Sequence, residues 1–201
     1  MNNLTASDGT KLSFNYWKGQ PQKTGVLLVH QLPANKESWQ MLVPELTGKG
    51  HTVLAIDYRG RGQSAGKLER PEDYQNIGLD VTAGLDYLQN KGVQKTIIIG
   101  ASIGANHALI VGAQDTRVQA VVLLSPGLDY RGVTTEEATA QIKKPVLIVA
   151  SQDDAYAAES SQKLAELAHA ELIMYKTAGH GTDLFVEKDL IPKIVEFVEK
   201  T

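Results

Sequence analysis

The chain has 201 residues, a formal net charge of −3 at pH 7 and no cysteine. Because a chain of this length can bury an adequate core, we expect residues 1–201 to form a single domain. The lack of cysteine excludes disulfides, a thiolate nucleophile and Cys-ligated zinc, and the lack of a Lys/Arg-rich block argues against nucleic acid as a partner.

The N-terminal sequence has neither the basic start nor the apolar run of a signal peptide. No stretch approaches the roughly eighteen apolar residues that a membrane span requires. We therefore expect a cytoplasmic protein without a membrane span, unless a signal peptide has been removed. The sequence does not distinguish a monomer from a homodimer.

Strand-like and helix-like segments alternate along the chain. Residues 11–17 alternate polar and apolar side chains, as an edge strand does. Six later runs are almost continuously apolar, which indicates burial on both faces. These runs are residues 26–29, 52–56, 96–99, 120–125, 145–150 and 171–175.

The segments between these runs have helical spacing of apolar residues. The expected helices are residues 39–46, 77–88, one that begins near residue 103, 134–141, 157–168 and 188–200. Thr134 and Glu137 have the spacing of a capping box at the start of the fourth. The pattern predicts an α/β fold of three layers, with helices on both faces of a mostly parallel sheet.

A lone hydroxyl stands between a predicted strand and a predicted helix. Ser102 is flanked by Gly100 and Gly104, in the pattern G-x-S-x-G. In this context the serine sits on a strained bend that exposes its hydroxyl at the carboxyl edge of the sheet. We expect Ser102 to be a nucleophile, and a serine nucleophile requires a base and a group that orients the base.

Both partners are available after later strands. Asp153 and Asp154 follow the strand that ends at residue 150, and His180 lies in a Gly-flanked loop after the last strand. The resulting chain order of Ser, Asp and His is the one expected for a nucleophile on a strand-to-helix bend.

With these segments the chain resembles the α/β-hydrolase fold family, in particular its small dienelactone-hydrolase-like and carboxylesterase members. Residues 26–32 resemble the family's H-G-x oxyanion segment, and residues 55–64 resemble its D-x-R-G-x-G-x-S loop. The resemblance implies a sheet of seven or eight strands. It also implies no cap domain, because only residues 125–144 separate the strands between which a cap is usually inserted.

The resemblance implies a role for each candidate residue. Ser102 attacks a carbonyl carbon, His180 takes its proton, and Asp154 orients His180. Asp153 stays open as the acid because a change of one residue in the turn would exchange the two, and Asp129 stays open because some members carry the acid there.

The backbone N–H groups of Ile103 and Leu32 are the expected oxyanion donors. Leu32 is the weaker assignment, because Gln31 replaces the family's usual glycine. Gln31, Tyr130 and Tyr156 are expected to contact substrate.

The sequence therefore predicts a serine hydrolase of carboxylic esters or related acyl compounds, with no cofactor and no metal. Acyl transfer and perhydrolysis use the same acyl-enzyme and stay open. A catalytically silent relative that binds a ligand or partner is one alternative. A nucleotide-binding module is another, although Ser102 and Ala105 occupy two of the three glycine positions of its motif.

Overall fold

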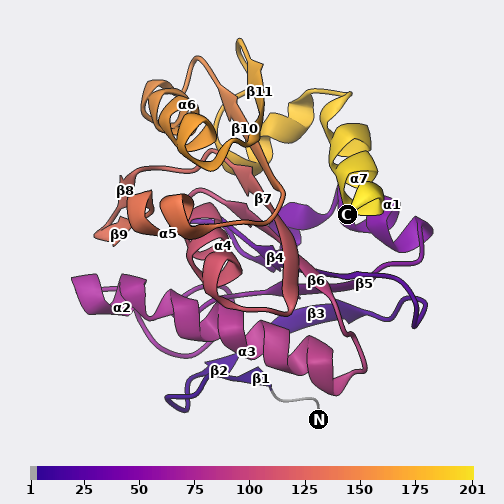
Figure 1. Ribbon diagram of the computed structural model, residues 1–201. Helices are drawn as coiled ribbons and strands as arrows, with labels where there is room; N and C mark the ends of the chain where they lie inside the picture. The colour runs from indigo at the N-terminus through magenta and orange to yellow at the C-terminus, as the bar shows by residue number, and fades with distance from the viewer. Residues whose placement is uncertain (1–3) are drawn as a thin grey trace.

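The computed structural model describes residues 4–201, and its central feature is a twisted sheet (Figure 1). The strands are β3 (Phe14–Trp17), β4 (Gly25–Val29), β5 (Thr52–Ile56), β6 (Thr96–Ala101), β7 (Val118–Leu124), β10 (Val146–Ser151) and β11 (Glu171–Tyr175). Within residues 4–201 this sheet has seven strands in the order β11-β10-β7-β6-β4-β5-β3. All neighbours pair in parallel except β3, the edge strand, which is antiparallel to β5.

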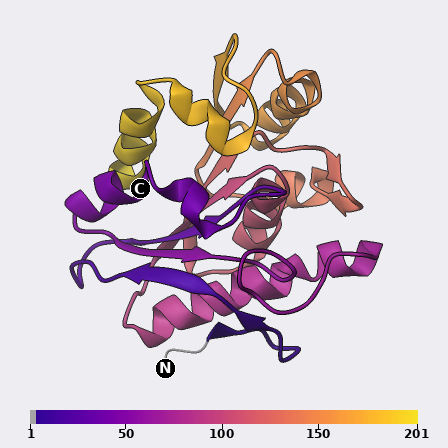
Figure 2. The same ribbon diagram turned by 180° about the vertical axis from the view of Figure 1, so that it is seen from behind.

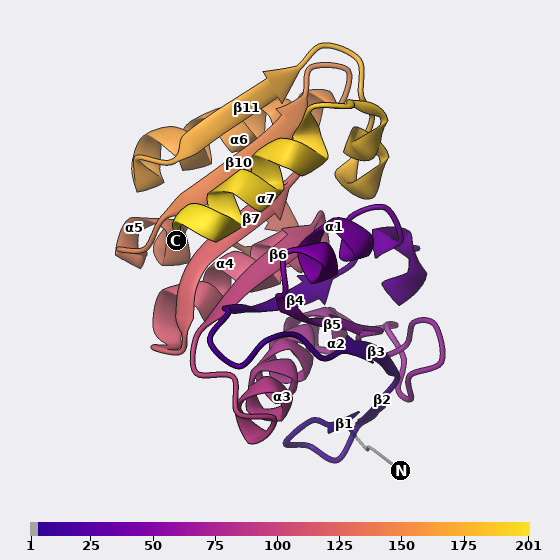
Figure 3. The ribbon, with the colours of Figure 1, turned by 90° about the vertical axis from the view of Figure 1, so that its right-hand side faces the viewer.

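Helices cover both faces of the sheet. One face is covered by α2 (Pro71–Gln75), α3 (Ile77–Asn90), α4 (Ile103–Gln114), α5 (Glu136–Gln141) and α6 (Ala155–Ala168). The other carries α1 (Val43–Gly48), α7 (Leu190–Lys200) and the 3₁₀ helices η1 (Lys36–Trp39) and η2 (Gly181–Val186). Figure 3 shows α7 and α1 on one side of the sheet with α3, α4 and α6 on the other, and Figure 2 shows α1 beside the C-terminus. The predicted three-layer α/β/α fold is confirmed.

The apolar residues of the strands divide between two cores. In β4, Leu27 and Val29 pack under α3 and α4, whereas Val26 and Leu28 pack under α1 and α7. All four side chains are fully buried. Strand β4 is apolar on both faces because helices cover the sheet on both sides.

The predicted edge strand 11–17 is interrupted at Ser13. Lys11–Leu12 forms a short strand, β2, that pairs with β1 (Leu4–Thr5) away from the central sheet. The N–H of Ser13 bonds to the hydroxyl of Ser64 at 2.8 Å, and its carbonyl accepts the N–H of Asp57 at 2.9 Å. Contacts with the distant loop of Asp57 and Ser64 interrupt the strand. The alternation of polar and apolar residues in the segment itself gives no sign of these contacts.

Two helix predictions are wrong in their boundaries. The expected helix 39–46 is divided into η1 and α1, because Pro44 has no N–H to continue a helix through its position. The expected capping box at Thr134 is absent, since Thr134 lies in β9 (Val133–Thr134), which forms a hairpin with β8 (Asp129–Tyr130). Helix α5 begins after Thr135 instead.

The connection between β7 and β10 contains only this hairpin and α5, so among residues 4–201 no cap domain is inserted there. Strand β4 lies between β5 and β6, which places the loops after β4 and β6 at the point where the strand order reverses. Crevices at such points are the usual ligand sites of open α/β sheets. No helix within residues 4–201 is long and apolar enough to cross a membrane.

Candidate active site

Ser102 occupies a strained bend between β6 and α4. Its backbone has φ 55° and ψ −124°, a conformation that costs a non-glycine residue about 1–3 kcal/mol. Its N–H donates to the carbonyl of Leu124 at 2.8 Å, which fixes the bend to β7. The side chain is almost buried and precedes the first turn of α4, where the helix dipole favours negative charge.

The two glycines beside Ser102 allow the backbones to approach closely. A Cβ on Gly100 would lie 2.2 Å from the carbonyl oxygen of Gly104, and a Cβ on Gly104 would lie 2.3 Å from that of Val29. Any side chain at either position would collide with backbone. The pattern G-x-S-x-G is therefore required by packing between β4, β6 and α4.

The expected oxyanion donors lie in the loops after β4 and β6. Ile103 is the first residue of α4, so its N–H has no partner within the helix. Within residues 4–201, the N–H of Leu32 donates no hydrogen bond to another residue. Burial lowers the pKa of His30 to about 4, so its neutral ring donates from Nδ1 to the carbonyl of Gln31 at 2.8 Å and holds the loop after β4.

Asp154 and His180 are in direct contact. Asp154 precedes the first residue of α6, and its Oδ2 lies 2.5 Å from Nδ1 of His180. Because a carboxylate can only accept, Nδ1 carries the proton, and a neutral ring then has its lone pair on Nε2. In that tautomer Nε2 is the acceptor nitrogen of the His180 ring.

The two other predicted acids have different partners. Asp153 accepts hydrogen bonds from the hydroxyl of Ser151 and from the N–H groups of Ala178 and Gly179. These bonds hold the pKa of Asp153 below its usual value. Asp129 accepts the N–H of Gly132 within the β8–β9 hairpin, at 2.7 Å. Of the three carboxylates considered from the sequence, Asp154 is the one that faces the imidazole.

Tyr130 is a neighbour of both the candidate nucleophile and the candidate base. Within residues 4–201 no hydrogen bond joins the Ser102 hydroxyl to the His180 ring, but both lie beside Tyr130. The ring centroids of Tyr130 and His180 are 6.2 Å apart, edge to face. Burial and the charge of Asp154 raise the pKa of Tyr130, while the nearby Ser102 side chain opposes the rise.

The polar groups of the three residues predicted to contact substrate, Tyr156, Tyr130 and Gln31, make hydrogen bonds within the protein. Tyr156 is exposed, but its hydroxyl donates to the carbonyl of Asp129 and accepts the N–H of Asp129. Tyr130 stacks edge to face on Tyr156 and donates to the carbonyl of Ser125 at 3.2 Å. The amide of Gln31 is buried against the loop of His180.

Sequence reasoning missed two serines that hold this loop. The hydroxyl of Ser125 accepts the N–H of Gly181 at 2.9 Å, and that of Ser151 accepts the N–H of Ala178 at 2.8 Å. Each serine follows or ends an apolar strand, β7 and β10 respectively. A polar residue at the carboxyl end of a buried parallel strand was the available signal.

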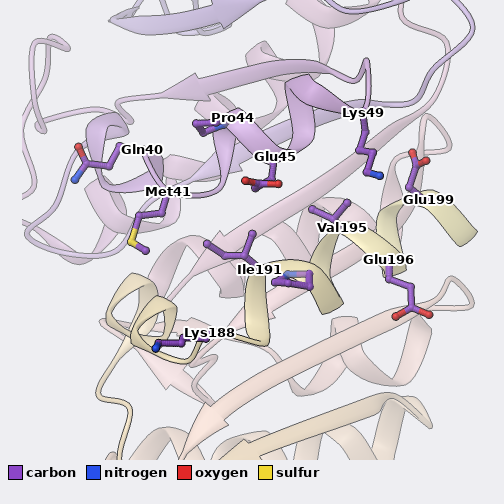
Figure 4. Close-up of a pocket in the computed structure, with 11 residues that line it drawn as sticks. Gln40, Met41, Pro44, Glu45, Lys49, Lys188, Ile191, Val195, Glu196 and Glu199 are labelled. Atoms are coloured by element: carbon purple, nitrogen blue, oxygen red, sulfur yellow. The ribbon is translucent and has the colours of Figure 1, made fainter.

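A groove of about 810 Å³ lies between α1 and α7, away from these residues (Figure 4). Its apolar lining includes Met41, Pro44, Ile191 and Val195, and charged side chains, Glu45 among them, also line it. None of Ser102, Asp154 and His180 lines it. Within residues 4–201, no group of three or more His, Asp and Glu side chains is arranged to hold a metal ion.

A family model described as alpha/beta hydrolase fold matches residues 25–140. The chain therefore belongs to the α/β-hydrolase fold family. Among curated proteins, rat (Rattus norvegicus) ABHD14B, named as a candidate protein-lysine deacylase, is 26% identical over 191 residues, or 90% of this chain and 86% of that protein.

Solved structures share the fold. The Pyrococcus furiosus esterase Pf2001 matches with a TM-score of 0.86 at 21% identity, covering 99% of this chain and 89% of the esterase. The enol-lactonase from Burkholderia xenovorans LB400 matches with a TM-score of 0.81 at 16% identity, covering 100% of both chains.

Proposed function

We propose that the protein is a serine hydrolase of carboxylic esters or related acyl compounds, with Ser102 as nucleophile, His180 as base and Asp154 as the acid that orients it. The observation that carries the proposal is the 2.5 Å contact between Asp154 and Nδ1 of His180, at the same sheet edge as the strained bend of Ser102. Esterase and enol-lactonase structures of the same fold support it.

The reaction proceeds in two halves. The hydroxyl oxygen of Ser102 attacks the carbonyl carbon while Nε2 of His180 takes its proton. The N–H groups of Ile103 and Leu32 stabilise the negative oxygen of the tetrahedral intermediate. Its collapse breaks the bond to the alcohol, which leaves with the proton from His180, and the acyl group stays on Ser102.

Water then completes the cycle. His180 takes a proton from a water molecule as that water attacks the acyl carbon, and returns it to Ser102 as the acid product leaves. An alcohol or peroxide in place of water would give acyl transfer or perhydrolysis by the same steps. The ratio of acid to transfer product in the presence of an added alcohol measures this choice.

Covalent labelling with a fluorophosphonate, followed by peptide mapping, tests the nucleophile. We expect modification of Ser102 and its loss in Ser102→Ala, whereas Ser161→Ala, which removes a buried hydroxyl in α6, remains labelled. Ser102→Ala should lower turnover of p-nitrophenyl acetate by about 10⁴-fold or more. Labelling elsewhere, or none, favours a catalytically silent ligand-binding protein.

A second candidate reaction is removal of an acyl group from a lysine side chain. The observation that favours it is the similarity to ABHD14B across most of both chains. The same groups would act on an amide in place of an ester. Release of acetate from an acetyl-lysine peptide, compared with hydrolysis of p-nitrophenyl acetate and with the Ser102→Ala variant, separates the two substrate classes.

A further inference from the structure

The side chain of Gln31 bonds at both ends of its amide to the loop that carries His180. Its Nε2 donates to the carbonyl of His180 at 3.3 Å, and its Oε1 accepts the N–H of Thr182 at 2.8 Å. The residue as a whole is 8% exposed. These two bonds use one N–H and one oxygen lone pair of the amide, and the residue that carries the remaining N–H and lone pair is buried.

Gln31 is itself held rigidly. The neutral ring of His30 donates to the Gln31 carbonyl at 2.8 Å, and that ring is buried and stacked on Tyr58 with centroids 4.1 Å apart. Gln31 follows the last residue of β4 by two positions. The amide therefore extends from a fixed point of the sheet to the loop after β11.

The loop after β11 leaves space for the Gln31 side chain at Gly181. Gly181 has φ +62°, and a Cβ at this position would lie 2.4 Å from Oε1 of Gln31. The N–H of Gly181 donates to the hydroxyl of Ser125, which is fully buried at the end of β7. Three successive backbone groups, from His180 to Thr182, are thus bonded to two buried side chains from the ends of β4 and β7.

We propose that Gln31 is a positioning residue whose amide, together with Ser125, fixes the main chain of His180 and joins the loop of the base to the loop of the oxyanion donor Leu32. This inference rests on the proposed function. An amide suits the task because it pairs a donor with an acceptor, matching a carbonyl and an N–H two residues apart. A displacement of about 1 Å in such a constellation costs on the order of 10²-fold in rate.

Two variants at this position separate positioning from general stability. Gln31→Met keeps the length of the side chain and removes both hydrogen bonds, so we expect kcat for p-nitrophenyl acetate to fall about 10- to 100-fold with KM nearly unchanged. Thr139→Val is the matched control, because it removes a buried hydroxyl that donates to the carbonyl of Thr135, the residue before α5. We expect it to lower thermal stability without lowering kcat.

Gln31→Glu adds a readout that a merely structural role would not give. The glutamate keeps an acceptor for the N–H of Thr182, but it donates to the carbonyl of His180 only when protonated. The ordinary pKa of a glutamate is about 4.3, and burial at this position would raise it. We therefore expect the rate of Gln31→Glu relative to wild type to rise as the pH falls from about 8 to about 5. The relative rate of Gln31→Met should stay constant over the same range, because methionine has no titratable group.

The outcomes distinguish the inference from the proposed function. If wild-type protein reacts with fluorophosphonate at Ser102 but Gln31→Met keeps its kcat, or raises KM alone as a substrate contact would, the inference is overturned and the proposed function stands. A pH-independent ratio for Gln31→Glu also overturns it. If wild-type protein fails to react at all, the proposed function and the positioning role of Gln31 fail together.

Discussion

Asp154 lies 2.5 Å from Nδ1 of His180, whereas the carboxylate of Asp153, one residue earlier, is bonded to Ser151 and to the N–H groups that precede His180. Two adjacent acids in one turn thus hold the same loop in different ways. Asp154 contacts the imidazole, and Asp153 fixes the backbone that carries it.

We predict that amide substitutions of these two acids have different effects. Asp154→Asn should lower kcat for a p-nitrophenyl ester by about 10⁴-fold, because the wrong tautomer of His180 is favoured. Asp153→Asn should lower kcat less than about tenfold and should act mainly on thermal stability, since it weakens hydrogen bonds to backbone. Steady-state kinetics and thermal unfolding of both variants measure this. If Asp153→Asn lowered kcat more than Asp154→Asn did, Asp153 and not Asp154 would be the acid that orients His180.

How far the sequence predicts the site depends on how locally each residue is fixed. Ser102, Asp154 and His180 each follow a strand whose apolar run is visible in the sequence, so their shared sheet edge was predictable. Their catalytic roles stay a prediction. The direction of the Gln31 side chain was not predictable, because its partners His180 and Thr182 come from the far end of the chain.

The same reasoning explains the errors in the fold. The β8–β9 hairpin is two residues long on each side, too short for an alternating pattern to show. Helix α2 was also missed, although Pro71 begins it and Asp73 accepts the N–H of Arg70 in a capping arrangement. Proline at a first helical position followed by acids was a usable signal.

We predict that Gly104→Ala abolishes the close contact between α4 and β4. The added Cβ would meet the carbonyl oxygens of Val29 at 2.3 Å and His30 at 2.6 Å, and these backbone atoms cannot rotate away. Helix α4 must therefore shift, which costs roughly 1–3 kcal/mol or more and moves Ile103. The free energy of unfolding, measured in urea, and the rate of ester hydrolysis should both fall.

Gly48→Ala is the matched control for this prediction. Gly48 lies in α1, and a Cβ there meets nothing within 4 Å. Alanine in a helix is favoured over glycine by roughly 0.5–1 kcal/mol, so stability should stay constant or rise. Equal losses in the two variants would mean that a general sensitivity to substitution, not the contact with β4, explains the effect.

We predict that Lys36→Met destabilises the protein strongly. Lys36 Nζ lies 2.8 Å from Oδ2 of Asp57, and both side chains are buried. Burial alone would raise the pKa of Asp57, but bonds from Lys36 and from the N–H of Gln63 hold it below its usual value. Removal of the cation leaves a buried charge unpaired, which typically costs about 3–5 kcal/mol.

A double-mutant cycle with Asp57→Asn checks this assignment by urea unfolding. Because the neutral amide needs no counter-charge, the second substitution should recover part of the loss in Lys36→Met. Additive losses would show that the two side chains act independently.

We predict that the protein loses stability as the pH falls from about 6.5 to about 4. Burial lowers the pKa of His107 to about 4, and the same cause lowers that of His30 to about 4. In the unfolded chain both titrate near 6.5, so between these values the unfolded state binds more protons than the folded state. The stability conferred by neutral burial is fully present above about pH 6.5, and each histidine removes at most roughly 3 kcal/mol by pH 4.

The variant His107→Gln isolates one of these contributions. Nε2 of His107 donates to the carbonyl of Tyr74 at 3.0 Å, and a glutamine amide can supply the same donor without titrating in this range. Urea unfolding at pH 7 and at pH 5 should show a smaller difference for this variant than for wild type. If the two proteins lose stability in parallel, His107 is protonated in the folded state or other groups dominate the acid response, and the assignment of neutral burial to this histidine fails.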